Sequence, residues 1–296
     1  NSKWCGCIPG LAEFEPLFFE ISPLEAELMD PQQRHLLQES WKALEDAGVG
    51  AEHIARDKIG MFVGVEESGG YQRKLKDISL TSGNTSILAA RLAYFLNFNG
   101  PTMAINTACS SSLVAAHLAC QSLRNGECDT ALAAGVNLMV TPEAYIGMTQ
   151  AGMLSPDGKC FVFDQRANGM VPGEAVTVLV LKRLSQALKD GNPIHAVIRG
   201  SGVNYDGKTN GITAPSGVSQ TKLLKEVYQR SGVEAEDIEY IVTHGTGTQL
   251  GDPVEINALY DTFKDVTTKQ EFCALTSTKT NFGHTFAASG LVSVVG

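Results

Sequence analysis

The sequence predicts an α/β protein with mainly parallel sheets that helices cover on both faces. Short apolar runs of the buried-strand type alternate with helical patterns, and glycines cluster beside polar residues where such runs end. The chain has 296 residues and is 43% hydrophobic, which is enough to bury one large core or two fused smaller ones. Alternation of strands with helices is typical of parallel sheets.

The individual elements follow from hydrophobic periodicity and from turn signals. A helix is expected over residues 25–47, because Leu28, Leu36 and Leu44 recur at helical spacing and Gly48 closes the pattern. Further helices are expected over residues 86–97, 110–123, 219–230 and 253–263. Buried strands are expected over residues 58–65, 101–107, 129–140, 175–181, 194–203, 238–243 and 272–277.

Charge and hydropathy exclude two classes of partner. The net charge of −9 argues against nucleic acid, because phosphate binding needs a basic surface and no Lys/Arg-rich face is visible. No window approaches the roughly eighteen uninterrupted apolar residues of a membrane span, and the first ten residues, NSKWCGCIPG, lack the pattern of a secretory signal. We expect a soluble, cytoplasmic protein.

The seven cysteines favour the same compartment. They are odd in number and have no framework spacing, which suits reduced thiols better than disulfides. Cys5-Gly6-Cys7 is the only close pair, and no second pair or Cys/His cluster accompanies it at ligand spacing. We therefore interpret these two as ordinary thiols and predict no zinc or other metal site.

Both ends of the chain are expected to be cut. The sequence begins without Met, and it stops at Val295-Gly296 inside the apolar run LVSVVG, which should continue as helix or strand.

Cys109 is the first candidate for chemistry. It lies between the strand predicted over residues 101–107 and the helix predicted over residues 110–123. A helix N-terminus presents unpaired N–H groups and positive potential, which favour the reactive thiolate. Free cysteine is also commonly a small buried apolar residue, and the local context alone leaves the two interpretations equally open.

Two loops supply further candidates. His244 follows an apolar run and opens the loop HGTGTQLGDP, and His284 ends the similar stretch STKTNFGH, in which Lys279 lies five residues earlier. A histidine at the end of a strand, beside flexible backbone, is well placed to meet a substrate. Taken singly, each of these residues is more often a satisfied surface or loop group.

These residues resemble those of a known family. The segments TACSSSL around Cys109, HGTGT at 244–248 followed by GDPVE, and KTNFGH at 279–284 resemble the three signature motifs of β-ketoacyl synthases, in that family's order. The segments DPQQR at 30–34 and FDQRANGMVPGE at 163–174 are similar to the ketosynthase domains of modular type I polyketide synthases.

The resemblance implies a thiolase-like fold, with two similar α/β halves in five layers (α-β-α-β-α), incomplete at both ends. Residues 1–296 would form a single partial ketosynthase domain. Its first half, about 1–190, would carry Cys109, and its second half, about 191–296, would carry His244 and His284. Members of the family are usually homodimers.

The resemblance also implies a reaction. Cys109 would take an acyl chain from an acyl carrier protein as a thioester, and a malonyl-type extender on a second carrier would lose carbon dioxide and attack it. His244 and His284 would donate hydrogen bonds to the developing enolate, and Lys279 would orient and tune His284. Thr246 and Thr248 would contact the phosphopantetheine arm of the carrier; the domain itself would bind no cofactor.

Some positions depart from the common pattern. Thr243 stands where Ala is usual, and Phe286 occupies a position that is often Glu. The segment HTFAASG resembles the variant of assembly lines that lack a built-in acyltransferase.

Three other functions fit parts of this pattern. They are a non-elongating ketosynthase that only transfers the acyl chain, a Cys-His thioester hydrolase, and a structural or carrier-docking domain. The presence of His244 favours elongation. Because carrier proteins are usually acidic, the basic cluster Arg73, Lys74 and Lys76 is one candidate docking surface.

Overall fold

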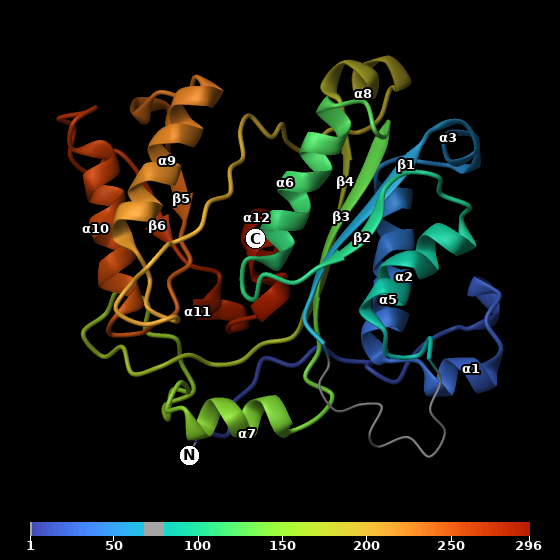
Figure 1. Cartoon of the computed structure of the whole chain (residues 1–296), viewed down its shortest axis with the longest axis horizontal. Coiled ribbons are helices and arrows are strands. Elements are labelled where there is room, and N and C mark those ends of the chain that lie inside the picture. The colour runs from blue at the N-terminus through green and yellow to red at the C-terminus, as the bar shows by residue number, and fades with distance from the viewer. Residues whose placement is uncertain (1, 68–79) are drawn as a thin grey trace.

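The computed structural model describes residues 2–67 and 80–296 of the chain (Figure 1). The basic cluster Arg73, Lys74 and Lys76 lies outside the described residues. In the described part, one sheet has four strands in the order β2-β1-β3-β4, where β1 pairs in parallel with β2 and β3, and β4 pairs antiparallel with β3. Their bounds are β1 Ile59–Val65, β2 Thr102–Ile105, β3 Thr130–Asn137 and β4 Ala175–Lys182.

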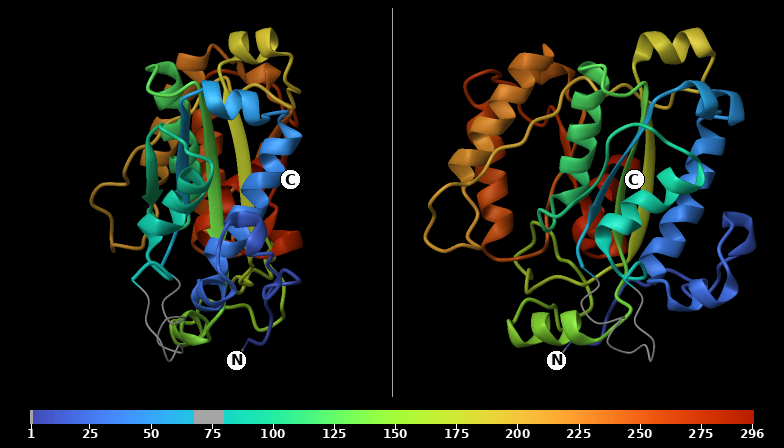
Figure 2. Two further views of the ribbon diagram at one scale, coloured as in Figure 1. Left: turned by 90° about the vertical axis from the view of Figure 1, so that its right-hand side faces the viewer. Right: turned by 45° about the vertical axis from the view of Figure 1, so that its right-hand side comes forward.

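Helices cover both faces of this sheet. Helices α2 (Pro31–Asp46) and α5 (Thr85–Phe95) pack on the face to which Met61 and Val63 of β1 point. Helix α6 (Ser111–Arg124) packs on the opposite face, against Phe62. The alternation along β1 gives three layers, with α6 on one side and α2 and α5 on the other (Figure 1 and the right-hand view of Figure 2).

A second, smaller α/β unit lies on the far side of α6 (Figure 1). In the described residues its sheet consists of two parallel strands, β5 (Tyr240–Val242) and β6 (Ala274–Thr276). Helices α9 (Gly217–Ser231) and α10 (Gly251–Phe263) pack together beside it, where the rings of Tyr228 and Phe263 are 5.5 Å apart between centroids. The prediction of mainly parallel α/β structure is thus confirmed, with β4 as the antiparallel exception.

The end of the described chain returns to the first unit. Helix α12 (Ser289–Val295) packs on α6, and its Leu291 belongs to the same core cluster as Phe62 and Ala115. This return brings residues near position 284 next to the N-terminus of α6. The remaining elements are α1 (Pro23–Leu28), α3 (Ala51–Arg56), α7 (Glu143–Gln150), α8 (Leu184–Asp190), α11 (Lys279–Phe282) and short 3₁₀ turns at Leu17–Phe19, Ala235–Asp237 and Phe286–Ala288.

Two of the predicted elements are wrong. The helix expected over residues 25–47 is two helices, because Met29 has extended backbone and Asp30 caps α2. The Asp30 side chain accepts a hydrogen bond from Gln32 N (2.8 Å), and Pro31 is the first helical residue. The strand expected over residues 194–203 is not formed. That segment has no strand beside it among the described residues, and its Ile194, Val197 and Val203 side chains are exposed.

Among the described residues, no helix combines the length and apolar character needed to cross a lipid bilayer.

Candidate active site

Cys109 lies in a sharp turn between β2 and α6. Ala108 adopts a left-handed backbone conformation (φ 54°), and the Ser111 hydroxyl accepts a hydrogen bond from Thr107 N (2.9 Å) while donating to Ala108 O (2.6 Å). The turn is therefore fastened by the first residue of the helix. As the sequence predicted, the nucleophile candidate lies directly before a helix N-terminus.

Two glycines hold the first turn of α6 tightly on the sheet. A Cβ atom at Gly64 of β1 would lie 2.4 Å from Ser112 N, and one at Gly135 of β3 would lie 2.6 Å from Ser112 Cβ. Neither position leaves room for a side chain, so the backbone of α6 rests directly on the strands. The position of Cys109 is thus set by backbone packing.

His284 faces the Cys109 thiol. Its Nε2 lies 3.1 Å from Cys109 Sγ, and the residue is 2% exposed. Its backbone is fixed on both sides, because His284 N donates to Val171 O (2.6 Å) and His284 O accepts from Gly173 N (2.8 Å). The sequence analysis placed these two residues in one site from motif order alone, and the structure brings them together across 175 positions of chain.

The other ring nitrogen of His284 defines its tautomer. Phe286 N donates to His284 Nδ1 (3.3 Å), so Nδ1 is an acceptor and the proton of the neutral ring lies on Nε2. The Phe286 ring stacks on the imidazole, with centroids 4.6 Å apart. His284 therefore presents an N–H donor to whatever lies at Cys109.

His244 completes the group. Its ring lies 5.4 Å from the His284 ring between centroids and nearly perpendicular to it, at 85°. The Glu255 carboxylate accepts hydrogen bonds from His244 N (2.7 Å) and Gly245 N (2.8 Å). Lys279, only 3% exposed, donates from Nζ to His244 O (2.6 Å). The hydrogen bond of Lys279 thus fixes the position of His244, whereas its effect on His284 is electrostatic.

The loop with Thr246 and Thr248 is organised around one buried carboxylate. Asp252 is 4% exposed, and its Oδ1 accepts from the backbone N–H groups of Thr246 (3.1 Å), Gly247 (3.2 Å) and Thr248 (3.4 Å). The two threonine hydroxyls lie 3.0 Å apart. Sequence reasoning missed the positioning roles of Asp252 and Glu255, although both lie in the GDPVE segment that follows HGTGT.

Burial and neighbouring charges set the protonation states. Burial and then the Lys279 charge lower the pKa of His244 to about 4, although one side of that residue is exposed to solvent. Burial, followed by Lys279 and His244, lowers the pKa of His284 well below its ordinary value. Both imidazoles are therefore neutral at pH 7.

The thiol departs from the expectation of a lowered pKa. Burial raises the pKa of Cys109, and the Glu66 carboxylate adds to this, while Lys279 and the Cys109 backbone N–H act in the opposite direction. The net direction is upward, because desolvation of the sulfur outweighs the nearby positive charge. The thiol is thus the resting form, and it must lose its proton during the reaction.

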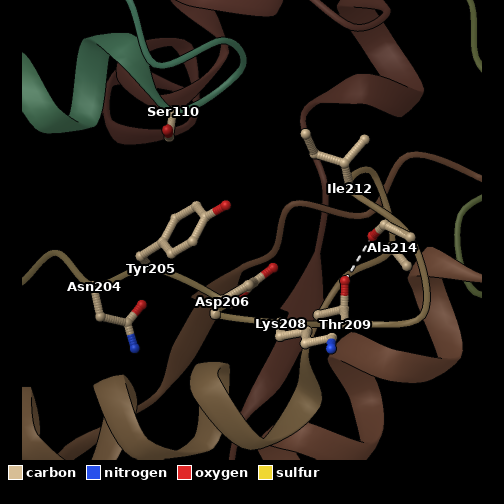
Figure 3. A pocket seen from close by; sticks show the side chains of 10 residues that line it. Ser110, Asn204, Tyr205, Asp206, Lys208, Thr209, Ile212 and Ala214 are labelled. Atoms are coloured by element: carbon tan, nitrogen blue, oxygen red, sulfur yellow. Dashed lines mark hydrogen bonds between the residues drawn. The ribbon is translucent and has the colours of Figure 1, made fainter.

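A surface pocket opens beside the nucleophile (Figure 3). It has a volume of about 500 Å³, with Ser110 on one side and the segment 204–214 on the other. The side chains of Asn204, Asp206 and Lys208 give it polar walls, and Tyr205 projects across it. An open hollow at Ser110, the residue after Cys109, with both polar and apolar walls is suited to a flexible substrate arm.

Comparisons with known proteins point to one family. The model of the β-ketoacyl synthase N-terminal domain matches residues 1–187, and that of the C-terminal domain matches residues 195–296. The polyketide synthase ThaG of Burkholderia thailandensis is 56% identical over 99% of the chain, and PksL of Bacillus subtilis is 51% identical over 99%. The chain spans only 5% and 6% of those two relatives.

Solved structures show the same fold. The chain matches the ketosynthase from module 6 of the bacillaene synthase of Bacillus subtilis 168 with a TM-score of 0.93 and 50% identity, over 98% of this chain and 51% of that one. It matches the oxazolomycin ketosynthase domain OzmH KS7 of Streptomyces albus with a TM-score of 0.92 and 37% identity, over 99% and 51%. The chain therefore has the thiolase-like fold that its motifs predicted and belongs to the β-ketoacyl synthase family, among the ketosynthases of polyketide synthases.

Proposed function

We propose that the chain is the catalytic part of a ketosynthase that extends a polyketide by decarboxylative Claisen condensation. One observation carries the proposal: a cysteine at a helix N-terminus faces the Nε2–H of a histidine whose tautomer is fixed, with a second neutral histidine beside it. An acyl-transfer reaction that passes through an enolate needs this combination of nucleophile and paired hydrogen-bond donors.

In the loading step, Cys109 Sγ attacks the carbonyl carbon of an acyl thioester on an acyl carrier protein. A carbon–sulfur bond forms to Cys109, the bond to the carrier sulfur breaks, and the carrier thiol leaves with the proton that Cys109 gives up. The Cys109 backbone N–H, which already interacts with the sulfur, is suited to stabilise the tetrahedral oxyanion.

In the decarboxylation step, a malonyl-type extender on a second carrier loses carbon dioxide. The electron pair of the broken carbon–carbon bond forms an enolate, whose charge lies on the thioester oxygen. His284 and His244 donate hydrogen bonds to that oxygen. Because both imidazoles are neutral, they are weak acids and stabilise the enolate without protonating it, which keeps its carbon nucleophilic.

In the final step, the enolate carbon attacks the Cys109 thioester, and the Cys109 sulfur leaves. Lys279 acts as a positioning residue: it fixes the His244 backbone and lowers the pKa of both histidines. Its charge also favours the Cys109 thiolate as that group leaves.

The substrate arm is proposed to be the phosphopantetheine of the carrier. Thr246 and Thr248 would contact it, a role supported by their hydroxyl pair on a loop that Asp252 holds rigid. The pocket between Ser110 and residues 204–214 supplies space for its approach. The partner is accordingly an acyl carrier protein.

Further properties are proposed from the family. We infer a cytoplasmic homodimer and one ketosynthase domain whose halves meet near residue 190. Strand β2 supports the dimer, because among the described residues it has a neighbouring strand on one side only, and an open edge can pair with a second copy. Sedimentation of a monomer at micromolar concentration would contradict this. The subgroup lacking a built-in acyltransferase stays a prediction from the sequence.

Acyl loading tests the nucleophile. Incubation with a small soluble acyl thioester should add one acyl mass to the protein, and Cys109→Ala should abolish the addition. Cys273→Ser provides a matched control, because Cys273 is also partly exposed and lies in the second α/β unit, where its thiol bonds only to Ala274 O. Acylation that persists in Cys109→Ala would show that the nucleophile is wrong.

Decarboxylation tests the histidines and separates the alternatives. His244→Ala should slow release of carbon dioxide from a malonyl carrier by roughly 100-fold, the size of losing one oxyanion donor, while loading continues. A protein that loads the acyl chain but never decarboxylates malonyl carrier would be the non-elongating enzyme. Release of free acid from acylated Cys109 at the rate of loading would identify the hydrolase instead.

A further inference from the structure

Residues 5–7 form an extended segment whose two cysteines face the same way. Gly6 N donates to Pro172 O (2.9 Å), and Gly6 O accepts from Glu174 N (2.7 Å), so the segment adds to the backbone of residues 172–174. A Cβ atom at Gly6 would lie 2.4 Å from Phe282 O. Alternate residues of an extended chain point to opposite sides, so Cys5 and Cys7 both point away from Phe282.

A third sulfur lies at the same place. Met139 Sδ is 3.9 Å from Cys5 Sγ, although the two residues are far apart in sequence. Burial raises the pKa of Cys5 to about 12, and the neighbouring Cys7 and Glu174 side chains act in the same direction. Cys5 and Met139 are partly buried and Cys7 is exposed, so the group is open to solvent on one side.

A buried carboxylate fixes the two parts of this group relative to each other. Glu174 is 6% exposed; its Oε2 accepts from Ile8 N (3.1 Å) and its Oε1 from Met139 N (2.8 Å). One side chain thus holds the backbone beside Cys7 and the backbone of Met139. The Glu174 hydrogen bonds thus set the positions of the sulfur-bearing residues. Metal ligands are commonly oriented by such neighbouring groups.

The geometry fits a soft metal ion. Two sulfurs that each lie ~2.3 Å from one ion at a trigonal angle are roughly 4 Å apart, which agrees with the 3.9 Å between Cys5 and Met139. In the described part of the chain, no three His, Cys, Asp or Glu side chains gather as a metal site, and the side chain near Cys5 that can act as a further ligand is the Met139 thioether. Thiolate with thioether is the ligand set that selects Cu(I).

A disulfide fits the segment less well. In extended chain the Cα atoms of residues two apart are ~6.7 Å from each other, at the upper end of the range of roughly 4.4–6.8 Å that disulfides span. Closing the bond would pull Cys5 and Cys7 together and disturb the hydrogen bonds of Gly6 to Pro172 and Glu174. A bridging ion requires the two sulfurs to approach only to about 4 Å, which demands less movement than the ~2 Å bond of a disulfide.

We propose that Cys5, Cys7 and Met139 form a binding site for one soft monovalent metal ion of the Cu(I) class. Binding replaces the protons of the two thiols with the ion, releases those protons to solvent and transfers no electrons. The site is separate from Cys109, but its segment pairs with residues 172–174, and Gly173 N donates to His284 O. Occupancy should therefore stiffen the backbone that holds His284.

The test is a competition for Cu(I) against a chromophoric chelator, performed anaerobically with the reduced protein. All variants carry Cys109→Ala, so that the catalytic thiol does not compete. Cys7→Ser and Met139→Leu should each weaken Cu(I) binding by at least about tenfold, as loss of a ligand or of its support does. Cys273→Ser removes a partly exposed thiol elsewhere and should leave binding unchanged.

Two further measurements identify the ligands. X-ray absorption of the loaded protein should show sulfur scatterers at ~2.3 Å, and their number should fall by one in Met139→Leu. A pH indicator should report about two protons released per ion at pH 7. Equal affinity in Cys7→Ser and Cys273→Ser would overturn the proposal, as would a Cys5–Cys7 disulfide, seen by intact mass, together with no uptake after reduction.

Discussion

The two sides of the catalytic site are held in place by different forces. Cys109 depends on apolar and backbone packing: α6 rests on Gly64 and Gly135 of two buried strands, and its inner face lies in the core. His244 and the threonine loop depend on polar groups, because Asp252, Glu255 and Lys279 bind the loop backbone directly. The nucleophile is fixed by shape, and His244 with its loop is fixed by charged side chains.

This difference has a physical reason. The nucleophile must stay at one point while different acyl chains load, and a close-packed helix end provides that. The loop around His244 is rich in glycine and could adopt many conformations, so each backbone N–H needs a defined acceptor. His284 shares both mechanisms: its backbone pairs with Val171 and Gly173, and its ring packs on Phe286.

The largest effect is expected from a change in the packing that holds Cys109. Gly64→Val would place a side chain where even a Cβ lies 2.4 Å from the α6 backbone, so we expect a stability loss of about 3 kcal/mol and at least 100-fold slower acyl loading. Thermal unfolding and acylation rates measure both. Gly50→Ala is the control, since nothing lies within 4 Å of that position. Loading at the parent rate in Gly64→Val would break the comparison.

A smaller and more selective effect is expected from a change in the charged side chains that hold the His244 loop. Asp252→Asn keeps the shape but replaces an acceptor of several backbone N–H groups, so we expect malonyl decarboxylation to fall by roughly 10–100-fold. Loading of Cys109 from a small soluble thioester should stay near the parent rate. Asp261→Asn, on the same helix and paired with Lys264, should change neither. Equal losses in loading and decarboxylation would mean that the position of Cys109 depends on the His244 loop.

The smallest effect is expected from removing the Lys279 charge, which acts on both histidines and on Cys109. Lys279 lowers the pKa of both histidines, so Lys279→Met should raise those pKa values and increase the protonated fraction as pH falls. A protonated imidazole would protonate the enolate, so the condensation product formed per carbon dioxide released should decline several-fold between pH 8 and pH 6 in Lys279→Met, whereas the parent stays flat. Lys264→Met, on an exposed lysine, should follow the parent profile. A loss that is identical at every pH would reduce Lys279 to a structural residue.

The sequence predicted the elements that local patterns determine. The strands around Ile59–Val65 and Thr130–Asn137 and the helix after Cys109 are confirmed, because their burial on one or both faces is visible as periodicity. Asp30 and Pro31 interrupt the apolar pattern too briefly to show as a break between two helices. The strand expected over residues 194–203 is wrong, because a strand needs a partner that no local pattern reveals.

The sequence predicted which residues form the site, but not how their protonation states are set. Motif order brought Cys109, His244, Lys279 and His284 together, and the structure places them in contact or near contact. The tautomer of His284 depends on Phe286 N, and the raised pKa of Cys109 depends on burial and Glu66. Such properties arise from tertiary contacts, which sequence spacing does not encode. A tertiary contact also accounts for Thr243 in place of the usual Ala. The Thr243 hydroxyl donates to Thr276 O and joins the end of β5 to β6.

The pairing of Gly6 with Pro172 and Glu174, and of Gly173 with His284, makes the order of synthesis matter. A ribosome that adds 5–20 residues per second leaves residues 5–8 without their partner segment for roughly 10–30 s, and His284 arrives later still. During that interval the exposed Trp4 and the two nearby thiols are available to chaperones, oxidants or metal ions. Residues 5–8 thus acquire their native contacts only after more than 160 further residues have been added.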